Sequence, residues 1–274
     1  MFKDHRLFSE IICSRYKGGN HLADLGIDIG GTNTDIVVFD GRFHHILTMK
    51  TEDFLSDPRN IEKYRNGVFA IAGWIRGGKI LKTPNIKNFR PELFTNLKVE
   101  NDANCFAVYV QYLFKKDHIF AVTLGTGVGA GVIASGKLYR GRGLASEIGH
   151  VHVEGDEKCV CGDRGHLENF FSGWAIKKKF GREIDRDEIV KYKGFKILCR
   201  EVAKAVMILD PQLVAFGGRI SEKLREEDFY LIYDYLPKEF DPEIKVIRDG
   251  LAVAKGAALL SYIEKDNSFP YKEG

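Results

Sequence analysis

The chain has 274 residues, of which 44% are hydrophobic and 29% charged, and its 41 basic and 38 acidic side chains give a net charge of +3. This length suffices for one large α/β domain or for two lobes, and the nearly balanced charge argues against a polyanion such as nucleic acid as the partner. The sequence has no apolar run of 18 residues and no apolar core in its charged N-terminal segment, so we expect neither a membrane-spanning helix nor a secretory signal.

The five cysteines indicate a reducing compartment. Their number is odd, and Cys13, Cys105 and Cys199 lie in apolar segments, where buried free cysteines are common. We therefore expect reduced thiols and a cytoplasmic location.

Residues 1–22 are predicted to be an N-terminal extension, because their charge is mixed and they end in a Gly-Gly-Asn break. A first structural unit follows, in which a glycine-rich turn and a hairpin turn separate the strands. Its parts are strand Ala23–Asp28, turn Gly30–Asn33, strand Ile36–Phe39, hairpin Asp40-Gly41 and strand His44–Lys50.

A second unit of the same design is predicted at 121–139. Its glycine turn and its hairpin both lie 95 residues after those of the first unit. Chance is a competitor, since glycine hairpins are common, but the shared spacing of both turns favours an internal duplication. We therefore predict two α/β lobes, at 23–115 and 116–274, with the last helix returning to the first lobe.

The remaining segments alternate between strands and helices, which places the fold in the α/β class. Strands are predicted at 68–72, 98–100, 213–216 and 243–247, and helices at 104–114, 167–180, 188–209 and 254–264. Residues 53–66 leave room for at most one brief helix, and Ser221 could cap a further helix.

The two glycine turns are candidate phosphate sites. At Gly30, Gly31, Thr32 and Asn33, and again at Gly125, Thr126 and Gly127, missing side chains let backbone N–H groups approach phosphate oxygens. Asp28, just before the first turn, could hold Mg²⁺. Each turn alone could equally be an ordinary β-turn, whereas two facing turns in duplicated units would form a clamp.

Two further strand ends are candidate sites. Gly217 and Gly218 follow a buried strand and could offer bare backbone to an adenine ring, or simply form a strand-to-helix turn. Asp102 follows another strand, at the end where open α/β sheets place reactive groups. The alternative is that Asp102 and its neighbour Asn101 only cap the next helix.

A stretch from Glu147 to Glu168 has the composition of a metal loop. It brings together His150, Cys159, Cys161 and His166, a set of N and S ligands suited to tetrahedral Zn²⁺. With all four positions filled, such a metal would be structural. The alternative is a surface loop with reduced thiols.

Together these residues resemble the ROK family of sugar kinases and sugar-responsive repressors. The similarity covers about residues 24–260 in the correct order. Its motifs are the turn Asp28–Thr32, Glu100–Asn104, Leu124–Gly131, Glu147-Ile148-Gly149-His150, the cysteine loop from Cys159 to Gly165 with Glu168, and Asp210-Pro211 with Val214–Gly218.

The resemblance implies a duplicated, two-lobed actin-like ATPase fold (ribonuclease H-like) with a cleft between the lobes. By similarity, Asp102 would be the general base for a sugar hydroxyl that attacks ATP, with Mg²⁺ as the companion ion. The residues that would bind the sugar are Asn101, Asp102, Glu147, His150, Glu168, Gly73 and Asn85. Homodimers are common in the family.

The sequence departs from the family pattern in three places. His166 stands where the zinc loop usually has a cysteine, although imidazole is also a good Zn²⁺ ligand. The segment between Thr32 and Asn101 is short, which predicts a more open sugar pocket. The N-terminal extension is too short for the DNA-binding domain of the family's repressors.

The leading hypothesis is therefore an ATP-dependent kinase for the 6-hydroxyl of glucose or a related hexose. N-acetylglucosamine, N-acetylmannosamine, fructose and allose kinases share these motifs, so the sequence does not identify the sugar. The alternatives from other classes are a non-catalytic sugar sensor and a zinc-stapled nucleic-acid module. The retained Asp102 and both glycine turns argue against the first, and the balanced charge argues against the second.

Overall fold

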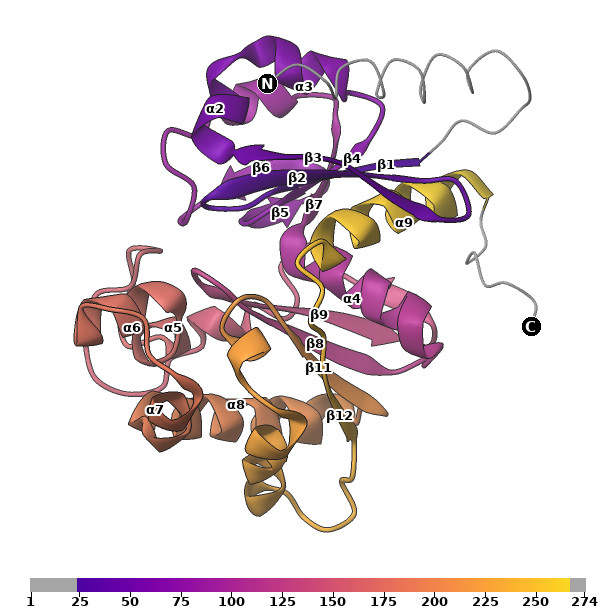
Figure 1. Cartoon of the computed structure of the whole chain (residues 1–274). Coiled ribbons are helices and arrows are strands. Elements are labelled where there is room, and N and C mark those ends of the chain that lie inside the picture. Colours follow the sequence, from indigo (N-terminus) through magenta and orange to yellow (C-terminus); the bar gives the residue numbers. More distant parts are fainter. Residues whose placement is uncertain (1–23, 267–274) are drawn as a thin grey trace.

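The computed structural model describes residues 24–266, so the predicted N-terminal extension and Cys13 lie outside the described part. Two five-stranded mixed sheets form its framework, and two helices lie between them (Figure 1). The strand order is β3-β2-β1-β4-β7 in the first sheet and β10-β9-β8-β11-β12 in the second. The two orders are equivalent, which is the duplication expected from the repeated glycine turns.

The first sheet is built from a hairpin and two parallel additions. Its strands are β1 (Asp24–Ile29), β2 (Asn33–Phe39), β3 (Phe43–Lys50), β4 (Val68–Ile71) and β7 (Lys98–Asn101). β1 pairs antiparallel with β2, which places Asp28 opposite Asp35, and parallel with β4. The first glycine turn thus lies at the carboxyl end of β1.

The second sheet repeats this plan. Its strands are β8 (Ile119–Leu124), β9 (Val128–Ala134), β10 (Lys137–Tyr139), β11 (Leu213–Gly217) and β12 (Glu243–Val246). β8 pairs antiparallel with β9 and parallel with β11, so the second glycine turn also follows the central strand of its sheet.

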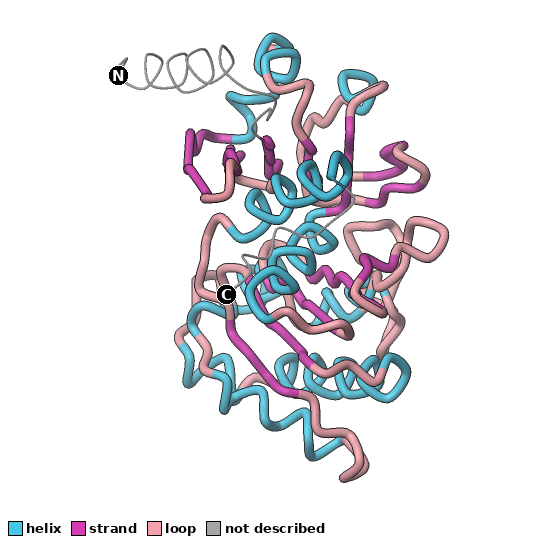
Figure 2. Tube along the Cα trace, turned by 90° about the vertical axis from the view of Figure 1, so that its right-hand side faces the viewer, coloured by secondary structure: helices cyan, strands magenta, loops and turns pink. Residues whose placement is uncertain are grey.

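Helices α4 (Asp102–Phe114) and α9 (Ala252–Asp266) fill the layer between the sheets (Figures 1 and 2). The nine residues from Ala103 to Gln111 are all buried, as expected for a helix that is covered on every side. Glycines allow α9 to approach α4 and β1 closely. A Cβ on Gly256 would lie 1.8 Å from the carbonyl oxygen of Cys105, and one on Gly26 would lie 2.1 Å from that of Ala254.

The outer faces of both sheets are also covered. On the first sheet lie α2 (Thr51–Ser56) and α3 (Pro58–Lys63), so the prediction of at most one brief helix in this segment was wrong. On the second lies α8 (Lys193–Leu209), and α5 (Leu167–Phe170), α6 (Gly173–Phe180) and α7 (Arg186–Lys191) lie beside one end of that sheet (Figure 1). Among the described residues, no helix is long and apolar enough to cross a membrane.

Three further predictions need correction. The segments 167–180 and 188–209 are each two helices, not one. Ser221 does not cap an α-helix: its hydroxyl donates to the carbonyl of Gly218 at 2.7 Å, and 3₁₀ turns follow at η3 (Ser221–Lys223) and η4 (Glu226–Tyr235). A small hairpin of β5 (Trp74–Arg76) and β6 (Lys79–Lys82) was not predicted, and a short 3₁₀ turn, η1 (Pro91–Phe94), follows it.

Candidate active site

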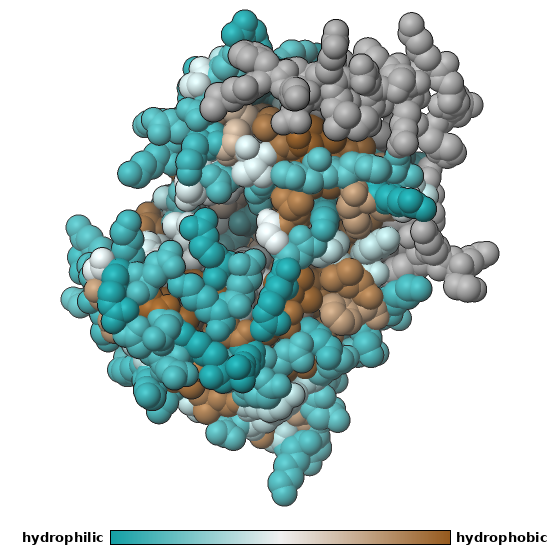
Figure 3. Space-filling model, in the orientation of Figure 1, coloured by the Kyte–Doolittle hydropathy of each residue, from teal (hydrophilic) through white to brown (hydrophobic). Residues whose placement is uncertain are grey.

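A cleft of about 920 Å³ opens between the two sheets, and hydrophilic residues surround the hollow in Figure 3. It gathers nearly all the residues that the sequence singled out for phosphate and sugar. Those lining it are Asp28, Gly30, Gly31, Thr32, Asn33, Gly73, Asn85, Asn101, Asp102, Gly125, Thr126, Gly127, Glu147, His150, Glu168 and Gly218.

The two glycine turns approach each other across this cleft. A Cβ on Gly31 would lie 3.6 Å from the hydroxyl of Thr126 and 2.9 Å from the carbonyl oxygen of Asn85. A Cβ on Gly127 would lie 2.7 Å from the Asn85 amide nitrogen and 2.8 Å from a Glu168 carboxylate oxygen. The Asn85 backbone therefore requires glycine at position 31, whereas at position 127 the near atoms are the ends of the Asn85 and Glu168 side chains; Asn85 contacts both turns.

Gly217 and Gly218, at the end of β11, have different surroundings. Gly218 has a φ of +90°, which favours glycine, and lines the cleft. Gly217 is buried, and a Cβ on it would lie 2.4 Å from the ring of Phe106. Gly217 thus serves packing against α4, and the structure does not place it on the cleft as the sequence analysis expected.

Asn101 and Asp102 form the junction between β7 and α4. The Asn101 side chain accepts a hydrogen bond from the backbone N–H of Asn104 at 3.1 Å and donates to the carbonyl of Gly73 at 3.0 Å. Asn101 is therefore the helix cap, while Asp102 is the first helical residue and lines the cleft. Capping accounts for Asn101 but leaves the Asp102 carboxylate facing the cleft.

Carboxylates converge on this junction. Burial raises the pKa of Asp102. Burial, together with the charges of Asp102 and Asp35, raises the pKa of Asp28 well above its usual value. Burial and then Asp102 raise the pKa of Glu147 to about 8. Such a cluster of like charges stores electrostatic repulsion that a cation or a proton relieves.

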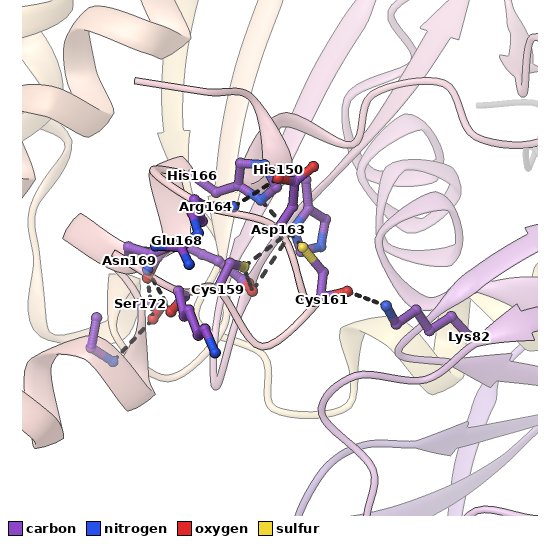
Figure 4. A network of polar contacts seen from close by, with 12 residues as sticks. Lys82, His150, Cys159, Cys161, Asp163, Arg164, His166, Glu168, Asn169 and Ser172 are labelled. Atoms are coloured by element: carbon purple, nitrogen blue, oxygen red, sulfur yellow. Dashed lines mark hydrogen bonds and ion pairs between the residues drawn. The ribbon is translucent and has the colours of Figure 1, made fainter. Parts of the chain in front are cut away.

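The metal loop supplies the opposite wall of the cleft. In Figure 4 the side chains of His150, Cys159, Cys161 and His166 gather at one point, and all their ligand atoms lie within 4.8 Å of one another. The distance from Cys159 Sγ to His150 Nδ1 is 3.7 Å, and that from Cys161 Sγ to His166 Nδ1 is 3.3 Å. A tetrahedral Zn²⁺ with such ligands sets separations of roughly 3.3–3.8 Å, so the cluster fits.

Glu168 connects the metal cluster to the cleft. Its Oε1 lies 3.2 Å from Cys159 Sγ and 3.9 Å from His150 Nδ1, and its side chain is buried. Burial raises the pKa of Glu168. The pKa of His150 is lowered to about 4, mainly by burial and further by the charges of His166 and Lys82. Nδ1 of the His150 ring faces the cluster, so the opposite edge of the ring, which carries Nε2, faces away from it.

The cleft also includes residues that the sequence analysis did not select. Trp74 packs edge-to-face on His150, with ring centroids 5.2 Å apart. Lys177, the first of three consecutive lysines in the last turn of α6, also lines the cleft. It lies one turn after Gly173, whose backbone N–H donates to the carbonyl of Gly125 at 2.9 Å, and this tertiary contact brings the start of α6 to the second glycine turn. Further charged lining residues are Asp35, Arg182, Glu183, Arg219, Glu222, Lys223 and Asp249.

Comparison with known proteins agrees with this geometry. A model described as the ROK family matches residues 24–231. The chain belongs to the ROK family. The N-acetyl-D-glucosamine kinase of Vibrio cholerae serotype O1 is 28% identical to it over 290 residues, which cover 84% of this chain and 91% of the relative. That of Pectobacterium carotovorum is 26% identical, with 87% and 99% covered.

Solved structures of ROK proteins share the fold. A ROK glucokinase from Streptomyces griseus in complex with glucose and AMPPNP matches with a TM-score of 0.68 and 25% identity, covering 87% of this chain and 99% of its own. A ROK hexokinase from Thermus thermophilus matches with a TM-score of 0.69 and 24% identity, covering 90% and 100%. The predicted family and its actin-like ATPase fold are confirmed.

Proposed function

We propose that this protein transfers the γ-phosphoryl group of ATP to a hydroxyl of a hexose. The class, an ATP-dependent sugar kinase, agrees with the names of its relatives. The observation that carries the proposal for this chain is the Asp102 carboxylate, which faces a cleft bordered by two opposed glycine turns. Phosphoryl transfer needs little more than a phosphate cradle and a positioned hydroxyl.

Asp102 is the proposed general base. Its carboxylate would accept the proton of the sugar hydroxyl while that oxygen attacks the γ-phosphorus. Burial raises the pKa of Asp102, which makes its carboxylate a stronger proton acceptor once ionised. The positive charge of Mg²⁺, when it is bound with ATP, would favour the ionised form of Asp102.

Asp28 and the two glycine turns are proposed to form the phosphate-binding side of the cleft. Asp28 is a carboxylate with a strongly raised pKa beside two other acids, a donor set that fits Mg²⁺. When bound with ATP, Mg²⁺ supplies charge neutralisation for the phosphates. Backbone N–H groups of both turns and the hydroxyls of Thr32 and Thr126 would hold the phosphate oxygens, with Gly218 on the nucleoside side.

Glu147, His150 and Glu168 are the proposed sugar wall, with Asn101, Gly73 and Asn85 opposite. The first three are polar groups within the stretch from Glu147 to Glu168 and line the same cleft as Asp102. Each can accept or donate a hydrogen bond to a sugar hydroxyl. Because Asn101 already makes two protein hydrogen bonds, its contribution to sugar binding is limited to its remaining N–H and lone pair.

A structural Zn²⁺ is proposed for the cluster of His150, Cys159, Cys161 and His166. The fit rests on the interatomic separations and on the N and S donor set. His166 is buried and faces Cys161, so it can replace the cysteine that the family usually has there. The site would fix the His150 ring and the start of α5, which carries Glu168.

The proposed acceptor is the 6-hydroxyl of glucose or N-acetylglucosamine. Relatives of this chain include N-acetyl-D-glucosamine kinases, and a structural neighbour is a glucokinase. The geometry of the cleft does not separate these sugars. A fructose or N-acetylmannosamine kinase is the alternative within the family.

An ADP-release assay tests the proposal. The full chain is incubated with Mg-ATP and each of glucose, N-acetylglucosamine, N-acetylmannosamine, fructose and allose. We expect ADP formation that requires one of these sugars and Mg²⁺. Sugar binding by calorimetry without ADP release from any of them would instead identify a non-catalytic sugar sensor.

A further inference from the structure

Glu100 and Arg140 form an ion pair that joins the two sheets, and Glu100 lies two residues before Asp102. Glu100 belongs to β7 of the first sheet, and Arg140 follows β10 of the second. Arg140 Nε donates to Glu100 Oε2 at 2.5 Å. Neither residue is among those that line the cleft, so the pair can affect chemistry only through the residues it holds.

Glu100 holds the start of α4. Its second oxygen, Oε1, accepts hydrogen bonds from the backbone N–H of Asn101 at 2.8 Å and from the side-chain amide of Asn104 at 2.9 Å. The Glu100 side chain is only 10% exposed, so these bonds are protected from water. Asp102 lies between two residues that Glu100 fixes, and its direction follows from theirs.

Arg140 also holds the sugar wall. Its carbonyl accepts hydrogen bonds from the backbone N–H groups of Gly143 at 2.7 Å and Ala145 at 3.3 Å. This turn leads directly to Glu147. Arg140 is therefore bonded through its side chain to Glu100, near Asp102, and through its backbone to the turn that leads to Glu147.

The charges around Cys105 give independent support for this placement. Burial is the largest cause of the raised pKa of the Cys105 thiol. The charges of Glu100, Asp28 and Asp102 raise this pKa further, and the charge of Arg140 lowers it. These three acids therefore lie close to one buried point, and Arg140 brings a positive charge to the same point. An arginine is suited to this because its guanidinium stays charged when partly buried.

We propose that Arg140 is a positioning residue for phosphoryl transfer. Through Glu100 it fixes the first turn of α4, and it thereby sets the direction of the Asp102 carboxylate relative to Glu147. The proposal rests on the function proposed above, with Asp102 as the base. A misplacement of about 1 Å in a catalytic group can cost roughly 100-fold in rate, whereas a half-exposed ion pair contributes little to stability.

The test compares Arg140→Met, Arg140→Lys and Glu100→Gln in the full chain. Glu100→Gln keeps an acceptor for Asn101 and Asn104 but removes the ion pair. We expect kcat to fall about 10- to 100-fold in Arg140→Met and Glu100→Gln, with partial recovery in Arg140→Lys. KM for ATP should change less than about 2-fold, because neither residue lines the cleft and their bonds run to the stretches that carry Asp102 and Glu147, not to the glycine turns. The double variant should be no worse than either single variant.

Arg186 provides a matched control. It pairs with Asp228 through bonds of 2.5 and 2.8 Å, and the exposed fractions, 36% for Arg186 and 5% for Asp228, resemble those of the Arg140 pair. Neither residue lines the cleft. Arg186→Met should lower the thermal midpoint about as much as Arg140→Met while leaving kcat within about 2-fold.

Equal kcat values for Arg140→Met and Arg186→Met would overturn the proposal, as would additive losses in the double variant. If the wild type turns over no sugar, the proposed function fails, and the wild type, Arg140→Met, Glu100→Gln and the double variant are compared by calorimetric sugar affinity. Non-additive losses of about 3- to 10-fold in Kd then support the positioning role, and additive or absent losses reject it. A wild type that neither binds nor phosphorylates any of these sugars rejects both proposals.

Discussion

Each sheet ends on a strand that leads into a helix between the sheets, and each of these junctions carries an aspartate. After β7 the chain enters α4 at Asp102, and after β12 it reaches α9 by way of Asp249. Asp249 accepts hydrogen bonds from the Tyr109 hydroxyl and from Lys255 Nζ, both at 2.6 Å. Within residues 24–266, Asp102 forms no such side-chain pair.

The surroundings give the two acids opposite properties. Burial raises the pKa of Asp102. Burial would also raise that of Asp249, but the hydrogen bonds from Lys255 and Tyr109 outweigh it and lower the pKa. Equivalent places in a duplicated fold thus hold one acid with side-chain partners and one that has none among residues 24–266. An unpaired buried acid costs stability, and this cost supports the proposed role of Asp102 as the base.

The largest expected effect comes from removing the unpaired acid. Asp102→Asn should lower turnover by about 10²–10⁴-fold, since the amide cannot accept the hydroxyl proton. Sugar affinity should change only a few-fold, because the side chain keeps its shape. Steady-state ADP release and calorimetry measure the two quantities.

Stability provides the control for this variant. Asp102→Asn removes a negative charge beside Asp28 and Glu147, so its thermal midpoint should equal or exceed that of the wild type. Near-normal turnover would show that Asp102 is not the base.

The paired acid should show the reverse pattern. Asp249→Asn loses the ion pair with Lys255 and weakens the bond from Tyr109, so we expect a loss of about 1–3 kcal/mol in unfolding free energy. Urea denaturation of Asp249→Asn, Lys255→Met and the double variant measures the coupling. If Asp249→Asn leaves stability unchanged but abolishes turnover, the contrast between the two acids is wrong.

The metal loop, Glu147 to Glu168, belongs only to the second half of the duplicated fold, and it offers a further test of the contrast between the two halves. Chelation should remove the proposed Zn²⁺, release the His150 ring, and weaken sugar affinity about 10-fold, as expected when a positioned ligand loses its support. Affinity for an ATP analogue, measured on the same sample, should stay within about 2-fold. Metal content by mass spectrometry and the thermal midpoint report the loss independently of activity.

A zinc-free protein with unchanged sugar affinity would separate the loop from the sugar site. A wild-type protein that purifies without any metal, from medium that contains zinc, would contradict the assignment of His166 as a ligand.

The sequence predicted the parts of the fold that repeat or carry unusual chemistry. Two glycine turns at equal spacing indicated the duplicated sheets, and the motif around Asp102 indicated the junction with α4. The cluster of His150, Cys159, Cys161 and His166 followed from residue type and spacing alone. In each case the signal is a short-range pattern of residue types.

Other features depend on tertiary contacts that periodicity does not contain. The break between α5 and α6 arises because the backbone N–H groups of Gly173 and Trp174 bond to the carbonyls of Gly125 and Thr126. A Cβ on Gly194 would lie 2.1 Å from the carbonyl of Phe170, so α8 begins where it meets α5. The pair of Glu100 and Arg140 joins different sheets. None of these contacts leaves a local signal.

The smallest expected effect is a pH dependence that distinguishes the paired from the unpaired acids. The pKa of Glu147 rises from an ordinary 4.5 to about 8 in the folded protein, so the folded state binds more protons between these values. The stability that this carboxyl contributes is therefore present below about pH 4.5 and is lost as the pH rises toward 8. For Asp249 the sign is opposite, because its lowered pKa gives stability above the ordinary 3.8 that is lost as the pH falls.

Glu147→Gln isolates the first of these contributions. Without ligands, the wild type should lose about 1–2 kcal/mol more than Glu147→Gln between pH 5 and 8, which is less than the full shift implies because solvent enters the open cleft. Urea unfolding at several pH values measures the difference, with Asp249→Asn as the variant whose deficit should shrink at low pH. Parallel pH profiles of the wild type and Glu147→Gln would mean that Glu147 is ionised and paired, like Asp249. In that case Asp102 alone would be the unpaired acid at the base of the sugar wall.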